Sequence, residues 1–316
     1  MDKKIAFIFP GQGAQYVGMG KDFYDTYPVA KEVFDRADQV LGCKFSDLIF
    51  QGPKEELTLT KNSQLAIFIV SYAIHEVVKQ HAPDMTPYVC AGLSLGEYTA
   101  LATSGKISFE DCLLLVKHRA QFMNDACESH PGSMSVVLGI QEDQVSSILS
   151  EITDHRVGIA NLNCPGQIVI AGTLQGLEVA SELLKNNGAK RILPLDVSGA
   201  FHSPLMKEAQ ERLTPNLQSV VLKETSIQIV MNTVGDFVCA TQDIRNQLIE
   251  QVTQPVRWEK GIHSMVASGV DLFIEIGCGK TLAGMNKRIG VSFPTLSIEK
   301  IEDLQVLLKD SLTCSC

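Results

Sequence analysis

The sequence predicts an α/β protein in which a large body carries a smaller ferredoxin-like insert, and three observations lead to this prediction. Strand-like apolar runs alternate along the chain with helix-length amphipathic runs. Between about residues 130 and 197, the expected order is strand, helix, strand, strand, helix, strand, as in a ferredoxin-like unit. The chain has 316 residues, 45% of them hydrophobic, which suffices for a large domain with an insert.

The first part of the body opens with the apolar run Ile5–Phe9, which stops at Pro10. The run is too short for a secretion signal and predicts a buried strand. Apolar residues then recur every four positions from Val29 to Leu41, which predicts a helix. The other elements expected before the insert are helices over Ser63–His81, Glu97–Thr103 and Asp111–Cys127 and a strand over Tyr88–Ala91.

The insert is predicted from its turn and stop signals. The segment Asn163-Cys164-Pro165-Gly166 indicates a turn between two strands, and Gly188 indicates a helix end. The expected strands are Ser133–Ile140, Val157–Leu162, Gln167–Ala171 and Lys190–Pro194, and the helices are Glu142–Ile152 and Leu174–Asn187. Further body elements are strands over Ile227–Asn232 and Leu272–Glu275 and a helix over Asp243–Val252. We therefore expect a body of residues 1–129 and 198–316 and a small subdomain of residues 130–197.

Charge and cysteine content exclude several classes of protein. The chain has 27 basic and 36 acidic residues and a net charge of −9, so general binding to nucleic acid or anionic membranes is not expected. No apolar run approaches the length of a bilayer span. The nine cysteines are dispersed without a C-x-x-C pair, which favours a reducing, cytoplasmic location over a disulfide framework. No metal site is expected, and the purpose of Cys314 and Cys316 stays open.

A candidate nucleophile lies in the segment Gly92-Leu93-Ser94-Leu95-Gly96, a G-x-S-x-G pattern between an expected strand and an expected helix. This context presents a serine hydroxyl on a sharp turn, and the N–H groups at the start of the helix face a developing oxyanion. The alternative is a glycine-flanked turn with an incidental serine.

A serine nucleophile needs a base, and His202 is the candidate among seven histidines. It lies in a loop after a strand among small residues, where catalytic side chains are often placed. The other histidines, at positions 75, 81, 118, 130, 155 and 263, lie on or beside predicted helices and strands and are interpreted as surface or core residues.

The first strand ends in Pro10-Gly11-Gln12-Gly13, whose glycines permit close approach of the backbone to a ligand. We interpret this turn as a second wall of the site, with the Gln12 N–H as an oxyanion donor. The alternative is an ordinary turn, and the pattern lacks the third glycine of a dinucleotide-binding motif.

Six motifs, in this order, resemble those of the malonyl-CoA:acyl-carrier-protein transacylases over about residues 4 to 290. They are Phe9-Pro-Gly-Gln-Gly-Ala-Gln15, Gly92-Leu-Ser-Leu-Gly-Glu-Tyr98, Lys117-His-Arg119, Asn163-Cys-Pro-Gly-Gln167, Phe201-His-Ser203 and Gln251-Val-Thr-Gln-Pro-Val-Arg-Trp258. The resemblance implies a hydrolase-like α/β body with a central, mostly parallel sheet and a ferredoxin-like insert.

The resemblance also implies the catalytic groups. Ser94 is the implied nucleophile and His202 its base, with a backbone carbonyl near Gln251, in place of a carboxylate, orienting the imidazole. The N–H groups of Gln12 and Leu95 are the implied oxyanion donors.

Arg119 is implied to bind the malonyl carboxylate. A guanidinium holds a carboxylate through two parallel hydrogen bonds, and an unpaired arginine in a closed pocket disfavours acyl groups without the acid, such as acetyl. Spacing alone favours a helix-surface salt bridge instead. Gln251, Phe201 and Asn163 are further implied substrate contacts, and the Phe201 ring predicts malonyl over methylmalonyl.

The chain departs from the family at Leu93, where the family often has histidine. That histidine is not the base, so the chemistry is expected to survive. The part that this position plays in shaping the acyl pocket stays open.

The implied reaction is ping-pong transfer of malonyl from malonyl-CoA to the phosphopantetheine thiol of acyl carrier protein, in fatty acid synthesis, with no metal or cofactor. Carrier proteins are acidic, so docking on this acidic chain requires a local basic patch. Candidate residues are Lys190, Arg191, Lys280, Lys287 and Arg288.

Three other functions are alternatives to this transfer. A serine esterase or thioesterase would need a histidine beyond Asp271 or Glu275, and the sequence has none there. A non-catalytic carrier-protein docking module would not need Ser94, His202 and Arg119. A discrete acyltransferase of a polyketide synthase would use the same chemistry, and the sequence does not distinguish it.

Overall fold

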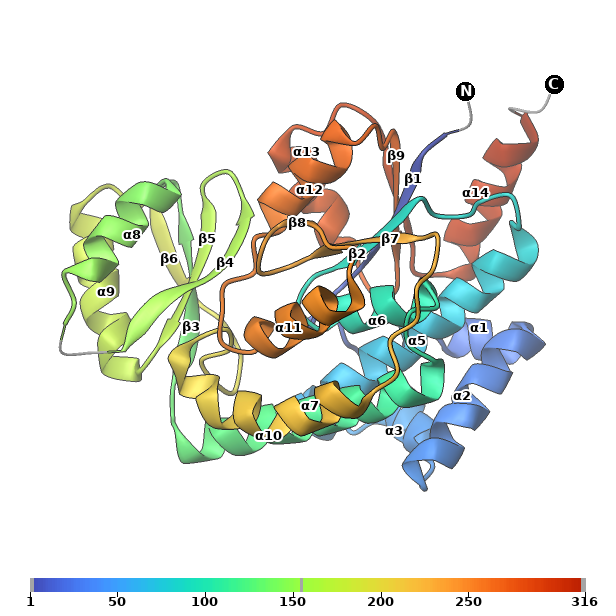
Figure 1. Ribbon diagram of the computed structural model, residues 1–316, viewed down its shortest axis with the longest axis horizontal. Coiled ribbons are helices and arrows are strands. Elements are labelled where there is room, and N and C mark those ends of the chain that lie inside the picture. The colour runs from blue at the N-terminus through green and yellow to red at the C-terminus, as the bar shows by residue number, and fades with distance from the viewer. Residues whose placement is uncertain (1–2, 154–155, 314–316) are drawn as a thin grey trace.

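A computed structural model describes residues 3–153 and 156–313, and Figure 1 shows their arrangement as a large body beside a small subdomain. The body contains a six-stranded sheet in the order β10-β9-β1-β2-β7-β8. Its strands are β1 (Ile5–Phe9), β2 (Val89–Gly92), β7 (Gln228–Met231), β8 (Asp236–Phe237), β9 (Leu272–Ile276) and β10 (Thr295–Ile298). All neighbouring strands pair in parallel except β7 and β8, so the predicted, mostly parallel sheet is confirmed.

Helices cover both faces of this sheet. The helices of the body are α1 (Lys21–Thr26), α2 (Pro28–Leu41), α3 (Phe45–Gln51), α4 (Lys54–Thr58), α5 (Thr60–His81), α6 (Gly96–Thr103), α7 (Phe109–Ser129), the short 3₁₀ turn η1 (Pro204–Met206), α10 (Lys207–Ser219), α11 (Thr241–Gln251), α12 (Trp258–Ala267), α13 (Thr281–Ile289) and α14 (Ile301–Thr313). Phe7 of β1 packs in the core with α5 and α7, whereas Ile8 packs in the core with α12 and α13. Burial on both faces explains why this strand is a continuous apolar run.

The small subdomain has its own sheet and core (Figure 1, green). Its elements are β3 (Ser133–Leu138), α8 (Glu142–Ser150), β4 (Val157–Cys164), β5 (Gln167–Gly172), α9 (Leu174–Asn186) and β6 (Arg191–Pro194). The sheet is antiparallel in the order β4-β5-β3-β6, so the predicted ferredoxin-like unit is confirmed. We propose that the subdomain spans residues 130–197, because every one of these elements falls within that range.

Strand β4 joins the subdomain to the body. The Leu162 N–H donates to the Val256 carbonyl at 2.8 Å, and the Val256 N–H donates to the Ala160 carbonyl at 2.8 Å. These backbone bonds fix one edge of the small sheet against the segment that precedes α12. The junction between the two units is therefore formed by backbone from each of them, namely β4 of the subdomain and the segment before α12 of the body.

Several helices have no counterpart among the predicted elements. The helices α1, α3 and α4 are short, at 6, 7 and 5 residues, so each contains too few turns to show an apolar period. Helix α10 contains Pro215, a residue that usually indicates a break in a helix. In the described ranges, no helix is both long enough and apolar enough to cross a bilayer.

Candidate active site

Ser94 lies on a strained turn between β2 and α6, with a φ of 53° in the left-handed region. Both flanking glycines are sterically required. A Cβ on Gly92 would lie 1.9 Å from the carbonyl carbon of Gly96, and a Cβ on Gly96 would lie 2.2 Å from the Phe9 carbonyl oxygen. The G-x-S-x-G spacing thus allows the turn to fold back against the end of β1.

The Ser94 hydroxyl and the His202 imidazole are in hydrogen-bond contact, with 2.8 Å between Oγ and Nε2. His202 Nδ1 lies 2.8 Å from the Gln251 carbonyl oxygen, which can only accept, so Nδ1 carries the proton and Nε2 is free to accept from Ser94. Burial and the nearby Arg119 charge lower the pKa of His202 to about 4. The imidazole is therefore neutral near pH 7, as a general base must be.

The two predicted oxyanion donors lie beside this dyad. Gln12 lines the same cavity as Ser94, and Leu95 follows Ser94 directly at the start of α6. Within the described part of the chain, neither backbone N–H has an acceptor. A Cβ on Gly11 would lie 2.6 Å from the Leu93 carbonyl oxygen, so the Gln12 turn is held close to the nucleophile turn.

Arg119 reaches into the site from α7 and is only 1% exposed. Its Nη2 donates to Ser94 Oγ at 3.0 Å and to Gln251 Oε1 at 3.0 Å, and its Nη1 donates to Gln64 Oε1. The buried Nε–H has no acceptor among the described residues. A helix-surface salt bridge, the alternative from spacing, is therefore wrong, and the guanidinium has capacity left for a carboxylate.

The dyad opens into a cavity of about 240 Å³ that both subdomains line. Phe201 and Leu93 contribute to its apolar wall. Asn163 contributes a polar group, and its Oδ1 is buried without a donor in the described structure. Gln251 does not line the cavity but lies buried, and its side chain contacts Ser94 and Arg119, so its contact with the substrate stays a prediction.

Two buried residues that sequence reasoning did not select hold the nucleophile turn. Asn232 accepts from the Ser94 N–H at 2.7 Å and donates to the Gly92 carbonyl at 2.7 Å. Glu97 accepts from the Asn232 N–H at 2.6 Å and from Gln251 Nε2 at 2.8 Å. The sequence contains one signal for each of these residues. Asn232 is a polar residue at the end of a body strand, and Glu97 is the one charged residue in the helix that follows Ser94.

The other histidines that the structure describes lie outside the site. His75 is buried in the core and its pKa is lowered to about 3 by burial, whereas His130 and His263 lie near Glu208 and Glu259 on the surface. His155 and the two C-terminal cysteines at 314 and 316 lie outside the described residues. No group of three potential metal ligands occurs in the ranges that the structure describes.

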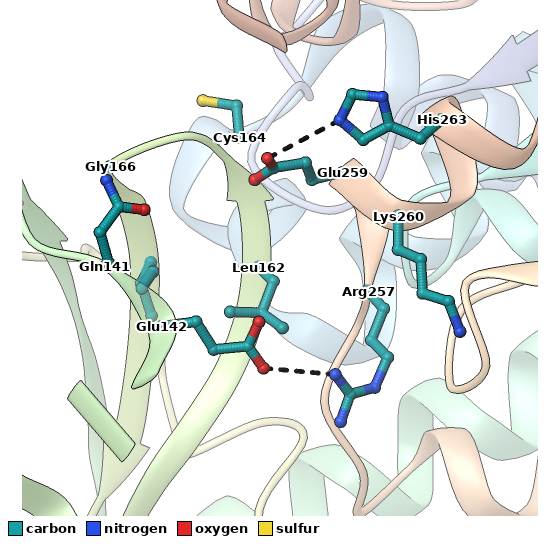
Figure 2. A pocket seen from close by; sticks show the side chains of 10 residues that line it. Gln141, Glu142, Leu162, Cys164, Gly166, Arg257, Glu259, Lys260 and His263 are labelled. Atoms are coloured by element: carbon teal, nitrogen blue, oxygen red, sulfur yellow. Dashed lines mark hydrogen bonds and ion pairs between the residues drawn. The ribbon is translucent and has the colours of Figure 1, made fainter. Parts of the chain in front are cut away.

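A second cavity of about 340 Å³ lies between the subdomains (Figure 2). In Figure 2, Arg257 of the body pairs across the cavity with Glu142 of the small subdomain, at 3.3 Å, whereas His263 and Glu259, 3.9 Å apart, both lie on α12. Neither pair includes a hydroxyl or thiol nucleophile, and the Cys164 thiol that lines this cavity donates to Gln167 Oε1 at 3.6 Å instead of contacting a base. The larger cavity therefore lacks the chemistry that the smaller one contains.

The candidate docking residues differ in their contacts. Lys287 and Arg288 lie exposed on α13, and Arg288 Nη1 donates to Gln167, which lines the cavity with Ser94. Lys280 pairs with Asp303 at 3.1 Å. The end of α13 thus brings positive charge to the rim of the cavity.

Comparisons with known proteins agree with this geometry. Residues 6–292 match the family model described as "Acyl transferase domain". The malonyl CoA-acyl carrier protein transacylase of Bacillus subtilis is 45% identical over 97% of this chain and 96% of its own length. The crystal structure of the Clostridium perfringens transacylase of the same name has a TM-score of 0.94 and 38% identity, covering 99% of this chain and 98% of that one. A malonyl-transacylase solved in complex with its type II PKS acyl-carrier protein has a TM-score of 0.93 and 35% identity, covering 97% and 99%.

Proposed function

We infer the function from the family: this chain belongs to the acyl transferase family and, within it, to the malonyl CoA-acyl carrier protein transacylases. It is an acyltransferase that moves the malonyl group of malonyl-CoA to the phosphopantetheine thiol of an acyl carrier protein, for fatty acid synthesis. The observation that carries this function is the contact of a single hydroxyl, Ser94 Oγ, with both a neutral imidazole and a buried guanidinium.

In the first half-reaction, Ser94 Oγ attacks the thioester carbonyl carbon while its proton passes to His202 Nε2. The resulting oxyanion accepts hydrogen bonds from the N–H groups of Gln12 and Leu95. The carbon–sulfur bond then breaks, and coenzyme A leaves as a thiol with the proton from His202. This proposal is supported by the Oγ–Nε2 distance of 2.8 Å and by the unpaired N–H groups of the described structure.

In the second half-reaction, the phosphopantetheine thiol gives its proton to His202 Nε2 and attacks the carbonyl carbon of the malonyl-serine ester. The carbon–oxygen bond to Ser94 breaks, and the proton returns from His202 to Oγ. Both halves exchange only an acyl group and a proton. We therefore propose that the reaction needs no metal or redox cofactor.

Substrate recognition divides between the two subdomains. Arg119 binds the malonyl carboxylate through its Nε–H and through the Nη2 N–H that donates to Ser94 Oγ before acylation. The unpaired Nε–H of the buried guanidinium supports this role. Asn163 Oδ1 accepts from an amide N–H of the pantetheine arm, which its unpaired, buried state supports. The Phe201 ring narrows the acyl pocket and disfavours an α-methyl branch.

A polyketide pathway is the second candidate for the destination of the malonyl group. The solved relative in complex with a type II PKS acyl-carrier protein favours it, because that relative covers 97% of this chain at 35% identity. The chemistry at Ser94 would be the same, and the carrier protein alone would differ.

We also propose a cytoplasmic location. The described cysteines at positions 43, 90, 112, 127, 164, 239 and 278 are free thiols, which suits a reducing compartment. Fractionation of the native cell would test this proposal, and recovery of the enzyme outside the cytoplasm would contradict it.

Transfer of labelled malonyl from malonyl-CoA to purified carrier proteins tests the function. We expect parallel lines in double-reciprocal plots, the mark of a ping-pong cycle, and a higher kcat/KM for a fatty-acid carrier protein than for a polyketide carrier protein. Release of free malonate with either carrier protein, without transfer, would indicate a thioesterase instead.

A further inference from the structure

Glu97 is a buried carboxyl group that the proposed reaction does not use. It is 0% exposed, lies in the first turn of α6 and does not line the cavity of Ser94. Burial raises the pKa of the Glu97 carboxyl to about 8, whereas the Asn232 N–H, the Arg119 charge and Gln251 oppose that shift. Both carboxyl oxygens accept from N–H donors, an arrangement that suits the ionised form. Because a buried acid is costly to keep, its contacts point to a task within the site.

The two oxygens of Glu97 hold the nucleophile turn from both sides. Oε1 accepts from the Asn232 N–H at 2.6 Å, and Asn232 in turn holds the Ser94 N–H. Oε2 accepts from Gln251 Nε2 at 2.8 Å, and the same Nε2 donates to the Ser94 carbonyl at 2.8 Å. The left-handed backbone of Ser94 is therefore fixed at its N–H and at its C=O through one carboxylate.

The Gln251 side chain also separates Glu97 from Arg119. Its Nε2 faces the carboxylate, and its Oε1 accepts from Arg119 Nη2 at 3.0 Å. Among the described residues no ion pair joins Glu97 and Arg119, and each of them bonds the Gln251 amide instead. A neutral amide thus lies between the carboxyl group and the guanidinium, so Glu97 in its ionised form offsets the charge of Arg119 without occupying the guanidinium's donors.

We propose that Glu97 is a positioning residue for malonyl transfer and the internal counter-charge of Arg119, and that Gln251 is the spacer that keeps these charges from pairing. The inference about Arg119 rests on the proposed function, because it assumes that the guanidinium binds the malonyl carboxylate. The inference about the Ser94 turn depends only on Ser94 being the nucleophile.

Glu97→Gln tests the positioning role. The introduced amide oxygen accepts a hydrogen bond from one of the two donors, the Asn232 N–H or Gln251 Nε2. Its NH₂ then faces the other donor, so the Ser94 turn loses one of its two supporting hydrogen bonds. We expect the rate constant for Ser94 acylation to fall on the order of 10- to 100-fold for malonyl-CoA and acetyl-CoA alike, with little change in the KM for malonyl-CoA. An acylation rate equal to that of the wild type would overturn the positioning role.

The spacer role is tested by Gln251→Glu and by the exchange Glu97→Gln/Gln251→Glu. In the exchanged variant, the amide now at position 97 can donate to the carboxylate now at position 251, which restores the bond between the two positions. That carboxylate, however, pairs directly with Arg119. We expect the exchange to unfold at a higher temperature than Gln251→Glu alone. We also expect it to lose the preference for malonyl-CoA over acetyl-CoA by at least about tenfold.

Two outcomes separate this inference from the function itself. An exchanged variant that folds and keeps the wild-type malonyl preference would contradict the spacer role, because the carboxylate introduced at position 251 would then face Arg119 without lowering that preference. A structural defect alone would slow the reaction with both substrates and leave their ratio unchanged. A wild-type enzyme that forms no malonyl adduct would contradict the proposed function instead. Should Glu97→Gln fail to fold, the malonyl-to-acetyl ratio of the exchanged variant still decides the spacer role.

Discussion

At the scale of single residues, the Ser94 hydroxyl lies between two groups with different tasks. His202 Nε2 is 2.8 Å away on one side and Arg119 Nη2 is 3.0 Å away on the other. An acyl group esterified at Oγ therefore begins beside the guanidinium, where the free carboxylate of a malonyl group can reach it. Nucleophilic attack and acyl selection are coupled through one atom.

Replacement of Arg119 by alanine should remove selection for malonyl. We expect the kcat/KM ratio for malonyl-CoA over acetyl-CoA to fall on the order of 100-fold, because the carboxylate would be buried without a partner. Arg257→Ala is a matched control, since that arginine lies at the other cavity and pairs with Glu142. An unchanged ratio in Arg119→Ala would contradict the carboxylate role.

The pH dependence of Ser94 reactivity follows from His202. Burial and Arg119 lower the pKa of His202 to about 4, and the base must be neutral to accept a proton, so reactivity should stay constant down to about pH 5 and fall as the pH drops through about 4. The rate of Ser94 inactivation by a sulfonyl fluoride reports this pH dependence without the titration of malonyl. A midpoint near the ordinary histidine pKa of about 6.5 would contradict the assignment. In Arg119→Ala the midpoint should move upward, because one of the two causes is removed.

At the scale of elements, the turn between β2 and α6 depends on two glycines rather than on the serine alone. Gly92→Ala and Gly96→Ala each place a Cβ within 2.2 Å of backbone atoms. We expect each variant to lower the free energy of unfolding by about 3 kcal/mol or more. Gly158→Ala in β4 is the control, because its Cβ would meet no atom within 4 Å, and it should change the stability little. Equal stability of the three variants in denaturant titrations would contradict this view of the turn.

An element or site residue could be predicted where neighbouring residues in the sequence indicate it, and could not where it depends on contacts between distant parts of the chain. Strand Ile5–Phe9 could be predicted to the residue because burial on both faces makes it uniformly apolar. Helix α10 could not, because Pro215 indicates a break while tertiary packing keeps the helix intact. Ser94 and His202 were predicted as candidates from local motifs and from the resemblance. By contrast, the roles of Asn232 and Glu97 depend on contacts across 138 and 135 positions of the chain, for which no local pattern exists.

At the scale of the whole molecule, the site is a product of the junction between the subdomains. Side chains alternate along β4, so Asn161 and Asn163 line the cavity of Ser94 while Leu162 and Cys164 line the second cavity. One strand of the insert therefore forms a wall of two cavities. The order of elements predicted both folds, but the sequence carries no local signal for how the two pack together.

Carrier-protein docking is a property of this whole surface, and the end of α13 is its candidate centre. Lys287→Glu/Arg288→Glu should raise the KM for the acidic carrier protein on the order of tenfold at low salt, with a smaller difference at high salt. Lys31→Glu on α2, which lies away from α13 (Figure 1), is the matched control and should leave this KM unchanged. A wild-type KM in the double variant would remove α13 from the docking surface.

Intact-mass measurement of the protein after mixing with malonyl-CoA, in the absence of carrier protein, tests the central claim most directly. The account predicts one malonyl adduct on the wild-type chain, mapped by peptide analysis to Ser94, and no adduct on Ser94→Ala. It also predicts that added acyl carrier protein removes the adduct. An adduct that persists in Ser94→Ala, or that maps to another residue, would contradict the account.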